Sequence, residues 1–274
     1  MHADVNGTRL VVERTGSGPP ILFVHGSTLD HRMWRTQVEA MSPRFECITY
    51  DVRGNGASAD PDGPFCHFED AAALLESLGI GGARKALVVG HSIGGLYSLE
   101  LSIARPDLVA GLALVCMSGL GVPSFPPDLI AMFGQVRAAA AERGVDAARE
   151  IWRAGGWFAP AREQGPVRAE LDTILDGYSG WYWQHQNPST NLVPPALDQL
   201  GSLSMPVLVL DGERDLDYNH AVATELAARI GDARLVRLPG VGHMAPMENP
   251  ALVTPELERF ADERVSPRSV RPNL

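Results

Sequence analysis

A serine flanked by glycines stands near the middle of the chain, in the segment Gly90-His91-Ser92-Ile93-Gly94. The five residues fit the pattern G-x-S-x-G, in which the serine occupies a tight turn between a strand and a helix. Such a turn exposes the serine hydroxyl, and the two glycines avoid a steric clash within it. The first N–H groups of the following helix also favour negative charge near the serine. The segment alone predicts either a nucleophilic serine or an ordinary strand-to-helix turn.

Acidic and imidazole side chains follow two apolar runs in the last third of the chain. The run 207–210 leads into the segment 211–215, which contains several acidic residues, and the run 235–238 leads into His243. Ligands of parallel α/β sheets bind beyond the carboxyl ends of the strands. A serine, a carboxylate and an imidazole that meet at that edge could transfer an acyl group through a covalent intermediate.

The elements that must position these residues alternate along the chain as strands and helices. Strand-like runs occur at 8–13, 21–24, 45–50, 85–89, 112–116, 207–210 and 235–238, and helical patterns at about 31–41, 68–78, 93–104, 219–230 and 250–264. The first run alternates in polarity and is interpreted as an edge strand. The alternation indicates a mostly parallel sheet with helices on both faces.

This rhythm is interrupted once, after the run that ends at Cys116. Residues 128–190 have helical patterns only and contain most of the tryptophans. We therefore predict a core domain made of residues 1–122 and 196–264, with a helical cap at 123–195 between its two parts. The polar tail at 265–274 is expected to be flexible.

Composition narrows the class of protein. A net charge of −10 opposes binding to nucleic acid, which needs a basic surface. The sequence has no signal-peptide pattern and no apolar run long enough to span a membrane. Its three cysteines form no C-x-x-C pair, which suits a reducing compartment. We expect a cytoplasmic protein without nucleic-acid or membrane partners, and the single lysine, Lys85, is typical of a GC-rich bacterial genome.

Five short motifs occur in order after successive strand-like runs. They are His25-Gly26-Ser27, Asp51-x-Arg53-Gly54-x-Gly56-x-Ser58, the G-x-S-x-G segment, Gly212-x-x-Asp215, and Gly242-His243 followed by Glu248-x-Pro250. Over about residues 8–262 the chain thereby resembles the α/β-hydrolase family, whose reactive residues follow in the order serine, acid, histidine. The resemblance implies an α/β fold with a mostly parallel eight-stranded sheet, helices on both faces, and a helical cap inserted after strand 6.

The resemblance also implies roles for individual side chains. Ser92 would attack a carbonyl carbon, and His243 would take and return the proton. Asp215 would orient the imidazole and stabilise its cation. Asp211 and Asp217 are nearby alternatives in the sequence, but the Gly-x-x-Asp motif favours Asp215.

The oxyanion of acyl transfer needs preorganised hydrogen-bond donors. By resemblance, these are the backbone N–H groups of Ile93, just after the nucleophile, and of Ser27, in an earlier loop. Relatives that act on haloalkanes or epoxides carry aspartate at the nucleophile position. The serine at position 92 therefore favours chemistry through an acyl-enzyme.

Other polar residues near these motifs have structural interpretations. His25 is expected to support the oxyanion loop, and His91 to pack or to form a hydrogen bond. Asp51 and Arg53 are expected to fix a glycine-rich turn. The remaining histidines lack the spacing of metal ligands, so we expect neither a metal nor a cofactor.

The aromatic residues of the cap are expected to pack its core and to roof a pocket. Candidate lining residues from this segment are Val122, Phe125, Met132, Phe158 and Trp183. Such a pocket suits a small, fairly apolar carboxylic ester, lactone or thioester. The alternatives are a carbon–carbon bond hydrolase, which often has asparagine at the position of His91, a cofactor-free perhydrolase, and a small-molecule receptor with slow turnover. The sequence leaves the oligomeric state open.

Overall fold

The computed structural model describes residues 1–121 and 124–264, and an eight-stranded sheet forms its centre. In spatial order the strands are β1 (His2–Val5), β2 (Thr8–Thr15), β4 (Glu46–Tyr50), β3 (Pro20–Val24), β5 (Ala86–His91), β6 (Val109–Val115), β7 (Val207–Gly212) and β8 (Ala233–Leu238). The two pairings of β2 are antiparallel, and all the other pairings are parallel. The mostly parallel eight-stranded sheet expected from the sequence is confirmed.

Strand β1 was not among the strands predicted from the sequence, and it forms one edge of the sheet. It forms a hairpin with β2 in which Val5 pairs with Thr8. The connecting Asn6 and Gly7 have φ of 47° and 68°, as the two-residue turns of hairpins require. The prediction that residues 8–13 form the edge strand was therefore wrong, because β1 is the edge and β2 is an inner strand. An Asn-Gly pair is a strong hairpin signal that could have located β1.

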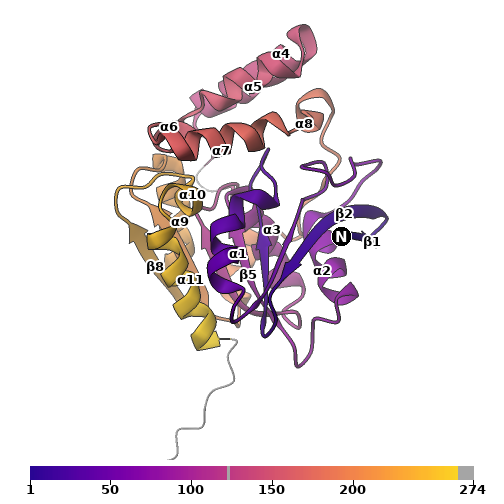
Figure 1. The fold of residues 1–274 in the computed structure, drawn as a ribbon, viewed down its shortest axis with the longest axis vertical. Helices are drawn as coiled ribbons and strands as arrows, with labels where there is room; N and C mark the ends of the chain where they lie inside the picture. Colours follow the sequence, from indigo (N-terminus) through magenta and orange to yellow (C-terminus); the bar gives the residue numbers. More distant parts are fainter. Residues whose placement is uncertain (122–123, 265–274) are drawn as a thin grey trace, which may run out of the picture.

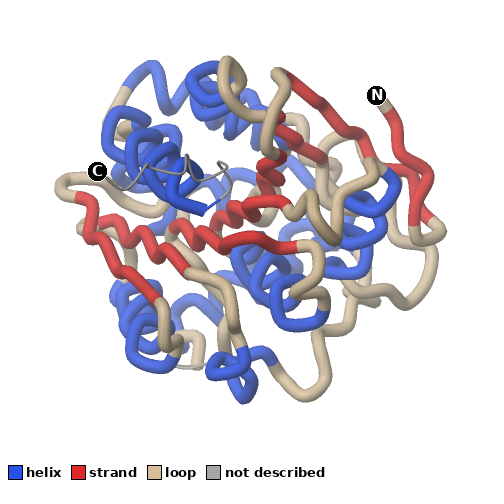
Figure 2. Tube along the Cα trace, turned by 90° about the horizontal axis from the view of Figure 1, so that it is seen from below, coloured by secondary structure: helices blue, strands red, loops and turns tan. Residues whose placement is uncertain are grey.

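Helices cover both faces of the sheet (Figure 2). The helices α1 (Arg35–Met41) and α11 (Pro250–Arg264) pack against one face, and α2 (His67–Ser77), α3 (Ile93–Ala104) and α9 (Asp217–Arg229) pack against the other. Successive side chains of a strand point to opposite faces. In β3, accordingly, Ile21 and Phe23 enter one core cluster, whereas Leu22 and Val24 enter the other. Burial on both faces explains why the inner strands read as continuous apolar runs.

A group of helices is inserted between β6 and β7 and lies beyond one end of the sheet (Figure 1). These inserted helices are α4 (Pro127–Arg143), α5 (Val145–Arg153), α6 (Ala159–Arg162), α7 (Gly165–Asp176) and α8 (Trp181–Gln184), with a short 3-10 turn at Gly156–Phe158. A further 3-10 helix at Ala196–Ser202 follows them and packs against α3 and α9. Aromatic rings pack among them, such as those of Trp152 and Trp157, whose centroids are 5.3 Å apart. The division into a core and a cap at 123–195 stays a prediction, because residues 122–123 lie outside the described ranges, as does the tail at 265–274.

Within the described ranges, no helix is both long and apolar enough to cross a membrane. The three cysteines, Cys47, Cys66 and Cys116, are free thiols. Burial raises the pKa of the Cys47 thiol to about 12. This thiol therefore stays protonated and inert near neutral pH.

Candidate active site

The backbone at Ser92 makes the sharp turn that its flanking glycines suggest. Ser92 follows β5 directly, has φ 54° and ψ −127°, and is followed by α3 at Ile93. A side chain at Gly90 would collide with Ser98, and one at Gly94 would collide with the backbone of His25. Both positions therefore need glycine for the close approach of α3 to the neighbouring strands, in addition to the bend itself.

Ser92, His243 and Asp215 form a continuous hydrogen-bonded chain. His243 Nε2 lies 2.9 Å from Ser92 Oγ, and His243 Nδ1 lies 2.8 Å from Asp215 Oδ2. The other carboxylate oxygen of Asp215 accepts hydrogen bonds from the Leu216 N–H at 2.7 Å and from the Asn219 side chain at 2.8 Å. Burial alone would raise the pKa of Asp215. The attraction of His243 and these hydrogen bonds outweigh burial, so the pKa is lowered and the carboxylate stays charged.

The two other aspartates of this region have different surroundings. Asp211 is buried and pairs with the His220 ring at 2.9 Å and with Arg237 at 3.0 Å. Asp217 begins α9 as its first residue, where a negative charge favours the helix N-terminus. Of the three candidate acids, only Asp215 bonds the imidazole of His243 in the described part of the chain.

The turn that carries His243 is held by two buried side chains. The carboxylate of Glu248 accepts from the N–H of Gly242 at 2.7 Å and from that of Met244 at 3.0 Å. His91 Nε2 donates to the carbonyl of His243 at 2.8 Å. Burial, and to a smaller extent the neighbouring His243, lower the pKa of His91 to about 3. His91 is therefore neutral and forms a structural hydrogen bond next to Ser92.

The loop after β3 packs against the turn that carries the serine. Gly26 packs so closely that a Cβ there would lie 3.0 Å from the Cβ of Ser92. The next residue, Ser27, lines the same cavities as Ile93. His25 braces this loop, since its ring bonds the Gly26 carbonyl and the Val52 N–H, each at 2.8 Å. Burial lowers the pKa of His25, so its ring is neutral.

Thr28 connects this loop to the inserted helices. Its N–H donates to Asn55 at 3.2 Å, and its hydroxyl accepts a 2.7 Å hydrogen bond from the indole N–H of Trp152 in α5. Thr28 has φ 62°, in the left-handed region. Cys116, the first residue after β6, has φ 47° and packs against Gly242. Together with Ser92, these residues concentrate backbone strain at this edge of the sheet.

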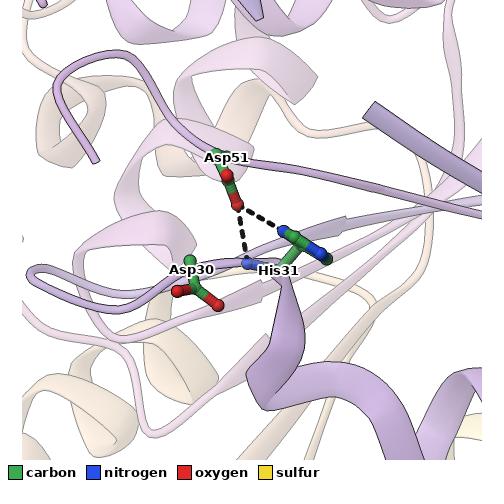
Figure 3. A group of neighbouring side chains, drawn as sticks. All are labelled: Asp30, His31 and Asp51. Atoms are coloured by element: carbon green, nitrogen blue, oxygen red, sulfur yellow. Dashed lines mark hydrogen bonds and ion pairs between the residues drawn. The ribbon is translucent and has the colours of Figure 1, made fainter. Parts of the chain in front are cut away.

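Asp30, His31 and Asp51 form a compact cluster near this loop (Figure 3). Their ligand atoms lie within 4.8 Å of one another, which is close enough for a metal ion. Asp30 already pairs with Arg32, and Asp51 accepts hydrogen bonds from His31 and from the Ala57 N–H. A side chain at Gly56 would collide with Asp51. We therefore interpret Asp51 as fixing the glycine-rich turn.

Two cavities adjoin each other beside the serine. The larger, of about 460 Å³, and the smaller, of about 180 Å³, share Gly26, Ser27, Ile93, Phe125, Phe133 and Trp152. Ser92 and His243 line only the smaller one.

The structure brings some of the predicted lining residues together here. Phe125 lines both cavities, Phe158 the smaller and Trp183 the larger. Met132 lines neither and lies beside Gly155 instead, whereas Val122 is outside the described residues. Further lining residues were not predicted from the sequence, among them Phe133, Trp152, Trp157, Tyr182 and Arg137.

A model of the α/β-hydrolase family matches residues 21–256. The chain belongs to this family. Its fold is similar to that of a thermophilic esterase from Thermogutta terrifontis, with a TM-score of 0.79 and 25% identity over 97% of this chain and 99% of that one. The enol-lactonase of Burkholderia xenovorans aligns with a TM-score of 0.76 and 26% identity over 95% and 99% of the two chains. A 2-(acetamidomethylene)succinate hydrolase from Mesorhizobium japonicum is 26% identical over 95% of this hydrolase and 94% of its relative.

Proposed function

We propose that this hydrolase cleaves a small, fairly apolar carboxylic ester, lactone or thioester through an acyl-enzyme on Ser92. The observation that carries the proposal is the hydrogen-bonded chain from Ser92 through His243 to Asp215. Serine is a weak nucleophile unless a base removes its proton. The chain supplies that base and a charged carboxylate that holds the imidazole in the required tautomer.

In the proposed reaction, Ser92 Oγ attacks the carbonyl carbon while its proton passes to His243 Nε2. The N–H groups of Ser27 and Ile93 stabilise the resulting oxyanion, and loss of one such donor typically lowers turnover by about 10²–10³-fold. His243 then donates the proton to the departing oxygen or sulfur, which leaves the acyl group on Ser92. Water, activated by the same imidazole, hydrolyses the acyl-enzyme.

The substrate class follows from the surfaces around the serine. Trp157, Phe158 and Leu29 give the smaller cavity an apolar wall, which favours an uncharged group there. The names of the similar esterase and enol-lactonase support an ester or lactone. In this proposal the inserted helices act as a cap that supplies the roof, whereas the core supplies the reacting groups.

Replacement of Ser92 by alanine tests the nucleophile. We expect Ser92→Ala to lower kcat on short p-nitrophenyl esters by at least about 10⁴-fold, because the alanine has no oxygen to acylate. Circular dichroism and the melting temperature check that the fold is kept. The exposed Ser77 provides a control, since Ser77→Ala removes a hydroxyl that bonds only within its own helix.

Retention of normal turnover by Ser92→Ala would exclude Ser92 as the nucleophile. Mass spectrometry of the wild-type protein during turnover should show an acyl adduct on the peptide that contains Ser92. A single stoichiometric acylation without further turnover would instead favour a receptor.

A further inference from the structure

We propose that the larger cavity binds an acyl chain that ends in an anionic group, typically a carboxylate, and that Arg137 recognises this group. The inference rests on the proposed function and defines its substrate class as half-esters of dicarboxylic acids.

The charge of the larger cavity is unlike that of the rest of the protein. The chain has a net charge of −10, yet no Asp or Glu is among the described residues that line this cavity. Arg137 is the one residue with a permanent positive charge in this described lining, and the neutral His25 ring adds none. An anion in this cavity would therefore meet one guanidinium and no fixed negative charge from the described lining.

Arg137 also differs in its partners from three other arginines of the inserted helices. Arg149, Arg153 and Arg162 each pair with an aspartate. The guanidinium of Arg137 is exposed and donates only to the carbonyl of His185, at 3.4 Å. Within the described residues it has no carboxylate partner, so its charge is available to a ligand.

Neutral polar side chains share the lining of the larger cavity with Arg137, and Asn187 and Asn191 are exposed as Arg137 is. Asn187, Ser189 and Asn191 follow α8 and line the same cavity. The inner wall is apolar and aromatic, with Leu96, Phe125 and other large side chains. A chain with methylene groups toward the serine and a carboxylate at its far end matches this order, because guanidinium and amide groups bind carboxylate oxygens well.

The chemistry of the serine assigns the two halves of the substrate to the two cavities. His243 must deliver a proton to the leaving group, and His243 lines only the smaller cavity. The larger cavity contains neither Ser92 nor His243 but reaches both residues of the proposed oxyanion site, Ser27 and Ile93. The leaving group therefore occupies the smaller, apolar cavity, and the acyl chain extends into the larger one toward Arg137.

The test uses p-nitrophenyl monoesters of dicarboxylic acids of increasing length, each matched with an ester whose acyl chain ends in a methyl group. We expect wild-type kcat/KM to favour the charged member at one chain length. Arg137→Gln should raise KM for that ester by about 3- to 10-fold, as expected for a partly exposed charged contact, with a much smaller change for the neutral ester. Salt at 0.5 M, about three times physiological ionic strength, should weaken the same preference.

Arg143→Gln is the matched control, because Arg143 is an exposed arginine of the same helix that does not line the cavity. This variant removes the same charge and should keep the wild-type preference. Equal KM changes for charged and neutral esters in Arg137→Gln would overturn the proposal. So would a preference for a carboxylate on the alcohol side of the ester.

Binding to Ser92→Ala separates this inference from the proposed function. Isothermal titration should show that Ser92→Ala binds the charged monoester more tightly than the matched neutral ester. The double variant Ser92→Ala, Arg137→Gln should bind the two esters equally. If the wild type hydrolyses no ester but this binding difference persists, the anion site stands and the hydrolase assignment fails. Equal binding of charged and neutral esters overturns the anion site.

Discussion

At the scale of single residues, three aspartates within seven positions have separate tasks because their partners differ. Asp215 bonds His243, Asp211 is paired with His220 and Arg237, and Asp217 begins a helix. Proximity in the sequence thus says little about which carboxylate serves the imidazole. The geometry favours Asp215.

The substitution Asp215→Asn tests this assignment. An asparagine would keep the size of the side chain but remove the charge that stabilises the imidazolium and selects its tautomer. We expect kcat on p-nitrophenyl esters to fall by about 10³–10⁴-fold. Asp211→Asn should lower stability, because it breaks a buried pairing, but should change kcat of the folded protein far less. A greater loss of kcat in Asp211→Asn than in Asp215→Asn would refute the assignment.

The residues that we propose as the reacting groups could be predicted from the sequence because each lies in the segment that follows a strand. Ser92, Asp215 and His243 stand at short, characteristic distances from apolar runs, and the topology of a parallel sheet brings such positions to one edge. The cavity lining could not be predicted in the same way. Met132 and Phe133 are neighbours on α4, but successive helical residues point about 100° apart, and only tertiary packing decides which one faces the cavity. Phe133 does.

At the scale of elements, α5 supports the loop after β3. The indole of Trp152 bonds the hydroxyl of Thr28, next to the N–H of Ser27 that we propose for the oxyanion. This bond joins the inserted helices to the core at the end of the sheet that carries Ser92. We therefore propose that the inserted helices help to orient an oxyanion donor as well as covering the substrate.

The substitution Trp152→Phe should lower kcat by about 3- to 30-fold, since a misplaced oxyanion donor loses part of its effect, with a smaller change in KM. Trp34→Phe is a matched control. The indole N–H of Trp34 is buried without a hydrogen-bond partner among the described residues, and Trp34 is not among the described residues that line the two cavities, so phenylalanine there removes area but no bond. If both variants lose kcat equally, the Trp152–Thr28 bond has no role in orienting the loop.

At the scale of the whole molecule, the buried Glu100 makes stability depend on pH. Its carboxylate on α3 accepts from the Leu192 N–H at 3.0 Å, in the segment that leads from α8 back to the core. Burial raises its pKa from 4.5 to about 7, although the hydrogen bond acts in the opposite direction. The folded protein therefore keeps this proton up to about pH 7, whereas the unfolded chain loses it near pH 4.5. Stability falls as the pH rises through this interval.

The substitution Glu100→Gln should remove this dependence. The neutral amide can still accept from Leu192, so the melting temperature of the variant should exceed that of the wild type increasingly as the pH rises from about 5 to about 8. Thermal unfolding at several pH values measures the difference. Glu69→Gln, at an exposed position of α2, should give no such trend. A constant difference between Glu100→Gln and the wild type would show that Glu100 does not titrate in this range.

Most of the fold could be predicted because burial on both faces leaves a plain signal. The apolar runs at 21–24 and 207–210 are fully buried strands. Strand β1 gave no such signal, because its side chains alternate between exposed and half-buried. The hairpin turn at Asn6-Gly7, rather than a hydrophobic pattern, is the feature of the sequence that indicates its place at the edge.

The strained backbone around the serine has a consequence for mutational tolerance. Four non-glycine residues in the described ranges have positive φ, and three of them, Thr28, Ser92 and Cys116, lie at the end of the sheet that carries the serine. Conformations of this kind cost about 1–3 kcal/mol each, whereas a domain is stable by only about 5–15 kcal/mol in total. A chain that holds such strain has a smaller margin for further destabilising changes. Substitutions in the sheet or its helices that an unstrained relative would absorb therefore bring this protein closer to unfolding.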